Sequence, residues 1–144
     1  MSSKDQRQKI KAHIRNKGNR DDFIITESFA LYWWYRLNLI IFDGVLTPPS
    51  KLYIQNYKDC GGWCAPWRWN RKNRTVKIGL RRNFCDRKTF LTCLAHEMVH
   101  QWEWEILGRW AEVGCHSGHG KSFFSWKNKI KYRTGLPLDK FIDL

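Results

Sequence analysis

Two long stretches of the chain combine frequent apolar residues with the absence of glycine and proline. Residues 29–42 are mostly apolar, follow a Thr-Glu-Ser sequence and end before Gly44, as a buried helix would. Residues 89–107 place apolar side chains at helical spacing, follow Asp86 as an N-cap residue and stop before Gly108. The pattern therefore predicts two long helices, the second with one buried side.

Between these helices the pattern changes to short runs typical of strands. Residues 52–57, 62–69 and 75–80 alternate in polarity or are rich in aromatic and β-branched side chains. Residues 70–74 have the composition of a turn that joins the last two runs. Pro66 assigns its strand to an edge or a bulge, because proline cannot donate to a sheet ladder. We expect a small, mainly antiparallel sheet.

The two ends of the chain differ in character. Residues 1–20 are polar and basic, which predicts a frayed helix or an arm that is either a solvated tail or a contact to nucleic acid. Residues 122–133 predict a last helix, which Gly135 and Pro137 stop. The expected organisation is this N-terminal segment and one α+β domain over residues 21–144, with helices packed on the sheet.

Composition supports one compact domain with an anionic partner. A length of 144 residues and a hydrophobic content of 42% can supply one core. The formal charge of +13 and the pI near 9.8 point to nucleic acid first and an acidic membrane surface second. The apolar stretch 29–42 is interrupted by Arg36 and Asn38 and is too short to span a bilayer.

The cysteines and the N-terminus bear on the compartment. Five cysteines follow a polar N-terminus without an apolar signal core, which favours a reducing compartment and free or metal-bound thiols. We therefore expect a soluble protein inside a cell, in the cytoplasm or with the nucleoid or nucleus, or inside the host cell if the source is a virus. Cys60 and Cys64 have a loose metal-like spacing that Cys115 and His116 could complete, but buried thiols are the preferred interpretation.

The second predicted helix carries the sequence His96-Glu97-Met-Val-His100. The i, i+4 spacing puts both imidazoles on one face about 6 Å apart, near enough to hold one Zn²⁺. Glu97 follows the first ligand directly, so it can take a proton from a metal-bound water. Two histidines alone would be an ordinary surface or buried pair, whereas the full motif on a strongly helical pattern favours a metal site.

A third ligand has to come from elsewhere in the chain. His119 is the best candidate, because the glycines on both sides let the backbone turn tightly and bring an imidazole to the helix. His116 is its rival, and Glu112 could in principle give a two-histidine, one-glutamate set. Ile106 stands where the metzincin extension would have its third histidine, so that class is excluded. Three protein ligands leave a fourth position for water, which distinguishes a catalytic zinc from a structural one.

Three segments of the sequence, in their order along the chain, resemble one known protein family. The segments Asn-Leu-Ile-Ile-Phe-Asp-Gly-Val-Leu at 38–46, Leu-Ala-His-Glu-Met-Val-His-Gln-Trp at 94–102 and Gly-His-Gly-Lys-Ser-Phe at 118–123 resemble the SprT-like zinc metalloprotease family, which includes Spartan. The similarity covers roughly residues 27–135.

The resemblance implies a minimal zincin-like domain with a cleft over the metal. It also implies His96, His100 and His119 as zinc ligands and Glu97 as catalytic base. Spartan-type members cut proteins crosslinked to DNA and are activated by DNA, which agrees with the charge. Family members often continue into a Cys-x-x-Cys zinc ribbon or into ubiquitin- and clamp-binding tails, and neither is found before Leu144.

The expected reaction is peptide hydrolysis by a zinc-activated water, with Glu97 moving the proton to the leaving amine. Tyr132 and Arg133 are guesses for the oxyanion donor. Cations around the predicted turn, interleaved with tryptophans, would hold phosphates while a tryptophan stacks on an unpaired base. These DNA candidates are Trp63, Trp67, Arg68, Trp69, Arg71, Lys72, Arg74, Arg81 and Arg82.

Two alternatives stay open. One is a nucleic-acid-binding module in which the zinc is structural and no protease activity remains, although such a site has no use for Glu97. The other is a protease for one specific free protein, with the basic surface matched to an acidic partner. For the DNA candidates, the competing interpretation is that alternate tryptophans belong to the core and the cations form a solvated face. We expect a monomer with a protein substrate.

Overall fold

The computed structural model describes residues 3–15, 23–57, 60–68, 73–109 and 119–139 of the chain. Its fold is mixed α+β, with helices packed on small sheets, as the sequence predicts. The elements in chain order are α1 (Ser3–Arg15), β1 (Phe23–Ile24), α2 (Glu27–Phe42), β2 (Lys51–Gln55), β3 (Gly62–Arg68), β4 (Arg74–Arg81), β5 (Asn83–Phe84), α3 (Arg87–Glu105), α4 (Lys121–Phe124) and α5 (Lys127–Thr134).

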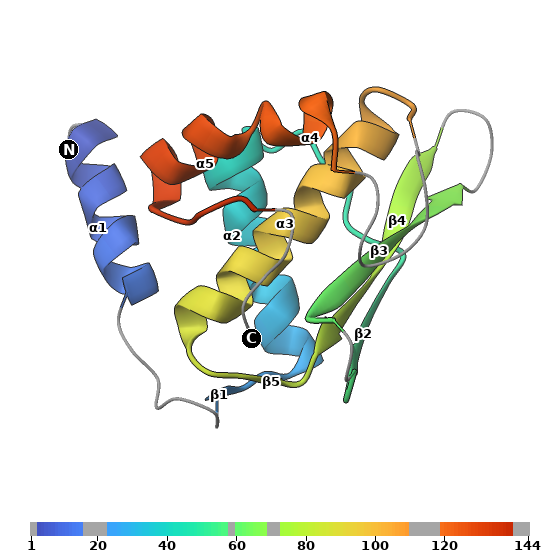
Figure 1. The fold of residues 1–144 in the computed structure, drawn as a ribbon, viewed down its shortest axis with the longest axis horizontal. Helices are drawn as coiled ribbons and strands as arrows, with labels where there is room; N and C mark the ends of the chain where they lie inside the picture. Colours follow the sequence, from blue (N-terminus) through green and yellow to red (C-terminus); the bar gives the residue numbers. More distant parts are fainter. Residues whose placement is uncertain (1–2, 16–22, 58–59, 69–72, 110–118, 140–144) are drawn as a thin grey trace.

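The larger sheet has three strands in the order β2-β4-β3, so the last strand in sequence lies in the middle. β3 and β4 are antiparallel and pair Arg68 with Arg74 across the predicted turn. β2 runs parallel to β4, with Leu52 opposite Ile78. The predicted antiparallel character therefore holds for β3 with β4 and for the short β1-β5 pair, but not for β2. Figure 1 shows the labelled helices on one side of this sheet.

β3 is an edge strand, as its proline predicts. Pro66 lies opposite Val76 of the central strand, and β3 has β4 as its one neighbour in the sheet order. A proline in the central strand would have removed a ladder hydrogen bond. The central strand β4 instead supplies the buried side chains of Val76, Ile78 and Leu80.

Helix α3 lies across the inner face of the sheet and forms the centre of the core (Figure 1). Asp86 caps it by accepting a hydrogen bond from the backbone N–H of Thr89 at 2.7 Å, as predicted. Helix α2 packs behind α3 and is capped by Thr26, which accepts from the N–H of Phe29. Its fully buried side chains include Trp33 and Trp34, so these aromatics belong to the core.

The other helices cover the side of α2 and α3 away from the sheet. α1 packs on α5 and α3 and contributes Ile10 to the core. The predicted last helix is divided into α4 and α5 by a turn at Ser125 and Trp126, whose backbone angles stay right-handed helical. The N–H of Trp126 donates to the carbonyl of Phe123, three residues back, instead of four. Trp126, at this turn, packs against Phe42 and Trp102. Among the described residues, no helix has both the length and the apolar content needed to span a membrane.

Candidate active site

Helix α3 delivers the first two histidines of the motif to the interior. Phe90, Leu91 and Leu94 are among the buried side chains of α3, which lie on all sides of its middle turns, so the prediction of one buried side is wrong. Burial fixes the orientation of the helix on the sheet. His96 and Glu97 are then only 4% and 5% exposed, while His100, one turn later, is half-buried. A pair of imidazoles at this depth needs a partner for its ring nitrogens.

His119 supplies that partner from the segment before α4. Its Nε2 lies 2.8 Å from Nε2 of His96 and 3.2 Å from Nε2 of His100. Two nitrogens bound to one tetrahedral Zn²⁺ at about 2.0–2.1 Å would be about 3.3 Å apart, so His119 lies near the required distance from each of the other two histidines. The ligand atoms of all three histidines lie within 4.8 Å of one another. The three histidines form a group that could hold a metal ion. The rivals His116 and Glu112 lie outside the described residues.

Phe123 forms the floor of this group. Its buried ring has its centroid 4.8 Å from the ring centroids of His96, His100 and His119. In the sequence, Phe123 is the last residue of the third segment that carries the family resemblance, but its contact with the histidines was not predicted. It follows His119 by four residues and belongs to the short helix α4, which begins at Lys121. The contact restricts the rotation of all three imidazoles at once.

The surroundings of His96 favour its neutral form. Burial, together with repulsion from the neighbouring His100 and His119, lowers the pKa of His96 from 6.5 to about 3. A proton on this ring would be poorly solvated and would lie close to two other imidazoles. Near neutral pH His96 is therefore unprotonated, which is the form that binds a metal.

Glu97 lies beside the histidines in an apolar environment. Its Oε1 is 3.9 Å from Nε2 of His96. Burial raises the pKa of Glu97 from 4.5 to about 7, and His100 acts in the opposite direction. A carboxyl group poised near neutrality can both accept and release a proton at physiological pH. The geometry and acidity are those of a general base.

Of the described cysteines, three are free thiols and Cys60 is disulfide-bonded. Cys64 and Cys93 are buried free thiols, and burial, followed by the charge of Glu97, raises their pKa values. Cys85 is a half-buried free thiol. Cys60 is disulfide-bonded, so the expectation of a free thiol there is wrong. Among the described residues, the three histidines are the one cluster suited to a metal, and Cys115 lies outside that part of the chain.

A buried hydrogen-bond network holds the far end of α3. Gln101 accepts from the indole N–H of Trp34 at 3.0 Å, and its amide donates to the carbonyl of Thr47 at 2.6 Å and to Glu105. Glu105 also accepts from the backbone N–H of Thr47 at 2.8 Å. Burial raises the pKa of Glu105, and these hydrogen bonds oppose the rise. The network ties α2, the segment before β2 and α3 together next to His100.

The two guesses for an oxyanion donor are engaged elsewhere. The guanidinium of Arg7 lies 4.5 Å from the ring centroid of Tyr132, which is exposed on α5. Arg133 donates to the carbonyls of Ile40 and Ile41, at 3.2 and 2.8 Å, at the end of α2. Both side chains therefore contact α1 or α2 and do not serve the histidine group in this structure.

The predicted DNA contacts fall on different parts of the sheet. Trp63 and Trp67 alternate with buried residues and lie on the face away from the helices, as Arg81 does by strand alternation. Arg68 and its partner Arg74 have the opposite alternation, and Arg74 lies against the ring of Trp104 from α3. Arg82 is exposed beyond the strand and donates to the carbonyl of Ile54. Trp69, Arg71 and Lys72 lie outside the described residues.

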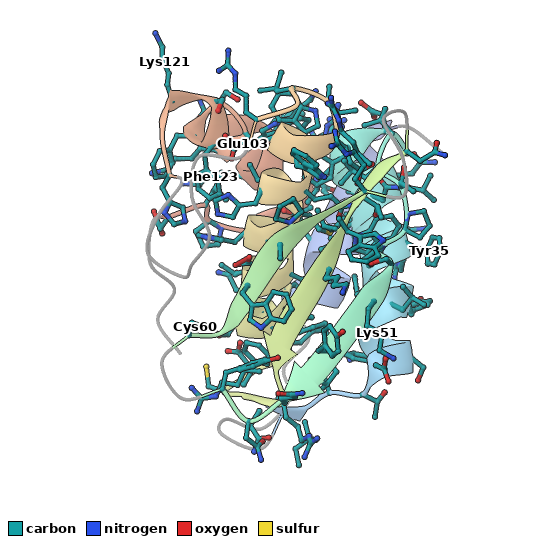
Figure 2. All side chains as sticks on the ribbon, turned by 90° about the vertical axis from the view of Figure 1, so that its right-hand side faces the viewer. Tyr35, Lys51, Cys60, Glu103, Lys121 and Phe123 are labelled. Carbon is teal, nitrogen blue, oxygen red and sulfur yellow. The ribbon has the colours of Figure 1, made fainter. Side chains whose placement is uncertain are left out.

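The sheet adds residues to this face that sequence analysis missed. We call it the outer sheet face and define it as Lys51, Tyr53, Trp63, Trp67, Lys77 and Arg81. It faces the viewer in Figure 2, where Lys51 is labelled. Lys51 and Tyr53 were not predicted on this face because the position of β2 in the sheet was unknown. Its parallel pairing with β4 brings Lys51 beside Lys77 and Tyr53 beside Gly79.

Aromatic rings on the outer sheet face contact one another and the ammonium groups of two lysines. The ring of Tyr53 lies 5.7 Å from that of Trp63, and Nζ of Lys77 lies 4.1 Å above the ring of Trp67. The indole of Trp63 lies across Gly79, where a Cβ atom would come within 2.2 Å of it. Glycine at this position of the central strand therefore lets the indole lie flat on the backbone.

The comparisons with known proteins agree with this geometry. A family model described as the SprT-like family matches residues 32–141. The matched region contains all three histidines, Glu97 and the larger sheet. A comparison with curated protein sequences gives no match.

Proposed function

The chain belongs to the SprT-like family, and on this premise we propose that it is a zinc-dependent endopeptidase that acts on DNA-bound or DNA-crosslinked proteins and is stimulated by DNA. The observation that carries the proposal is the convergence of three imidazole Nε2 atoms next to a buried carboxyl group. A site that only stabilised a fold would not need Glu97 beside it.

The donor set fits Zn²⁺ better than a harder cation. His96, His100 and His119 offer imidazole nitrogen ligands, which suit zinc and other transition metals, whereas Mg²⁺ and Ca²⁺ prefer oxygen. Three ligands leave room for a water molecule in a tetrahedral site. When bound, zinc supplies an acidified water and polarises the scissile carbonyl.

Glu97 performs the proton transfers of the proposed reaction. As a carboxylate it accepts the proton of the attacking water, and as a carboxylic acid it donates that proton to the leaving amine. Its apolar surroundings make both forms accessible near neutral pH. Phe123 and the core side of α3 keep the histidines in place and exclude bulk water from the inner side of the group.

The link to DNA is supported by charge and by the outer sheet face. A formal charge of +13 attracts a polyanion, and Lys51 and Lys77 place part of that charge beside aromatic rings. Trp67 is 42% exposed, so one of its edges is open to solvent. Unpaired bases can stack on such rings while phosphates contact the cations. Single-stranded DNA therefore suits this face better than an intact duplex.

The test measures cleavage of a basic protein substrate, and of the enzyme itself, with and without single-stranded DNA. The wild type is compared with Glu97→Gln at equal zinc content. Cleavage that requires Glu97 and increases with DNA is the expected result. Zinc and DNA binding without cleavage in either protein would favour a binding module with a structural zinc. Cleavage at the same rate with and without DNA would support the proposed hydrolysis but not the role of DNA. It would favour a specific free protein as substrate.

A further inference from the structure

Glu103 lies one turn after His100 on α3 and turns its carboxylate back towards that ring. Its Oε1 is 3.3 Å from Nδ1 of His100, and the two side chains are only 13% and 12% exposed. The i, i+3 spacing makes them neighbours on one helix face. This carboxylate is not one of the three groups that converge on the metal position. It contacts the ring nitrogen on the other side of the imidazole.

The second oxygen of the same carboxylate reaches a different element. The hydroxyl of Ser122 donates a hydrogen bond to Oε2 of Glu103. Ser122 belongs to α4, follows His119 by three residues and precedes Phe123, the floor of the histidine group. Figure 2 shows Glu103 close to Phe123, where α3 meets α4. One carboxylate therefore joins the second histidine to the segment that carries the third.

We propose that Glu103 is a positioning residue of the metal site, an inference that rests on the proposed function. By accepting the Nδ1 proton of His100, it fixes the tautomer in which Nε2 is free to bind the metal. Nε2 is indeed the atom of His100 that faces His119, at 3.2 Å. By accepting from Ser122, the same carboxylate holds the start of α4 so that His119 meets the two histidines of α3.

Glu103 and its neighbour Glu105 on the same helix have different partners. Glu105 accepts from Thr47 and Gln101 and thus braces α3 against the segment before β2. Glu103 instead has both of its oxygens directed at the two parts of the chain that supply ligands. Removing Glu103 should therefore alter metal binding more than folding.

The experiment measures zinc affinity by competition with a chromophoric chelator, and the absorption spectrum of the Co²⁺-loaded protein. Glu103→Ala, Glu103→Gln and Ser122→Ala are compared with the wild type. The control is Glu27→Gln, which removes the same charge from an exposed side chain near Lys51. The melting temperature of each metal-free protein shows whether folding is affected.

Glu103→Ala should weaken zinc binding by about 10–100-fold, the usual effect of removing a carboxylate behind a histidine ligand. Glu103→Gln keeps an acceptor oxygen and should lose less zinc affinity. The control Glu27→Gln should bind zinc as tightly as the wild type. Ser122→Ala should lose affinity in the wild type but not in the Glu103→Ala background, because the hydroxyl acts through the carboxylate. If Glu103→Ala destabilises the metal-free protein, the zinc affinities of Glu103→Gln and Ser122→Ala test the inference instead. Unchanged affinity in both variants would then overturn it.

Unchanged zinc affinity and an unchanged Co²⁺ spectrum in Glu103→Ala would overturn the inference. A loss beyond 1000-fold with a changed coordination number in the Co²⁺ spectrum would also overturn it, since Glu103 would then be a ligand. Failure of the proposed function is separable, because a wild type that binds zinc but cuts no protein rejects the protease while leaving this inference standing. A wild type that binds no zinc rejects both.

Discussion

The two faces of the three-stranded sheet differ in the burial and the charge of the side chains that they carry. On the inner face, Val76, Ile78 and Leu80 of β4 are fully buried and fix α3, whose histidines and Glu97 lie in a shielded environment. On the outer sheet face, the intervening Lys77 and Gly79 support charged and aromatic side chains that remain accessible. Strand alternation alone separates them, because successive side chains point to opposite faces.

This difference shows why the two proposed activities can be altered independently. Shielding on the inner side shifts the pKa values of His96 and Glu97 by limiting solvation of their charged forms. Exposure on the outer side leaves ammonium groups and ring edges open to a large polyanion. A substitution on one face should therefore change chemistry without changing DNA affinity, and a substitution on the other should do the reverse.

The largest expected effect is on the inner side. Glu97→Gln should reduce peptide hydrolysis by about 10²–10⁴-fold, the usual contribution of a general base, because the amide cannot accept the proton. Zinc content and affinity for single-stranded DNA should stay at the wild-type level. Kinetics of a fluorogenic peptide, metal analysis and a DNA titration check these three points. Equal loss of DNA affinity would mean that the two faces are coupled.

The next effect concerns stability of the metal-free protein against pH. The pKa of Glu97 is raised by folding, so its contribution to stability is complete below pH 4.5 and is lost as the pH rises through about 7. From pH 4.5 to pH 8, the wild type should lose about 3 kcal/mol of unfolding free energy relative to Glu97→Gln.

Urea unfolding of chelator-treated proteins at several pH values measures that difference. The depressed pKa of His96 acts in the opposite direction, since its stability contribution is complete above pH 6.5 and is lost as the pH falls towards 3. It is present in both proteins and cancels in the comparison. A difference that did not change with pH would show that Glu97 is not shielded from water.

On the outer sheet face, Trp67→Ala should weaken binding of single-stranded DNA by about 1–3 kcal/mol, the usual contribution of one stacked base. Hydrolysis of a small peptide without DNA should be unchanged, because Trp67 does not contact the histidine group. Fluorescence anisotropy with an oligonucleotide measures the affinity. Tyr132→Ala, which removes another exposed aromatic ring on α5, is the matched control and should bind DNA normally. Equal affinities of the two variants would contradict the assignment of this face.

The smallest effect is expected from a single cation. Lys77→Gln should reduce the slope of log affinity against log salt concentration by about 0.7 for single-stranded DNA, the value for one phosphate contact. Lys127→Gln on α5, whose ammonium lies near Asp139, should leave the slope unchanged. Titrations at four salt concentrations distinguish the two. An unaltered slope for Lys77→Gln would remove this lysine from the DNA contact.

Much of the fold was predictable because local signals and burial agree. The caps of Thr26 and Asp86 and the helical apolar spacing located α2 and α3, and Pro66 identified an edge strand. The direction of β2 was not predictable, since a period of two is the same in parallel and antiparallel pairs. The turn between α4 and α5 was also not predicted, because neither glycine nor proline marks it in the sequence.

In the candidate site, too, some features were predictable from the sequence and others were not. The spacing of His96 and His100 and the glycines beside His119 were enough to suggest three ligands. Phe123 is part of the third segment that carries the family resemblance, but neither its contact with the three imidazoles nor the contact between Glu103 and Ser122 could be predicted from the sequence, because each depends on how α4 docks on α3. Short-range motifs identify reactive groups, whereas the residues that orient them are determined by tertiary packing.

The pairing of β1 with β5 has a practical consequence for anyone who shortens this chain. The family match begins at residue 32, inside α2, but Phe23 pairs with Phe84 just before α3, and Thr26 caps α2. A fragment cut at the boundary of the match would lose a cap worth about 1 kcal/mol, the first turn of α2 and the strand next to β5. Expression fragments should therefore begin before Phe23.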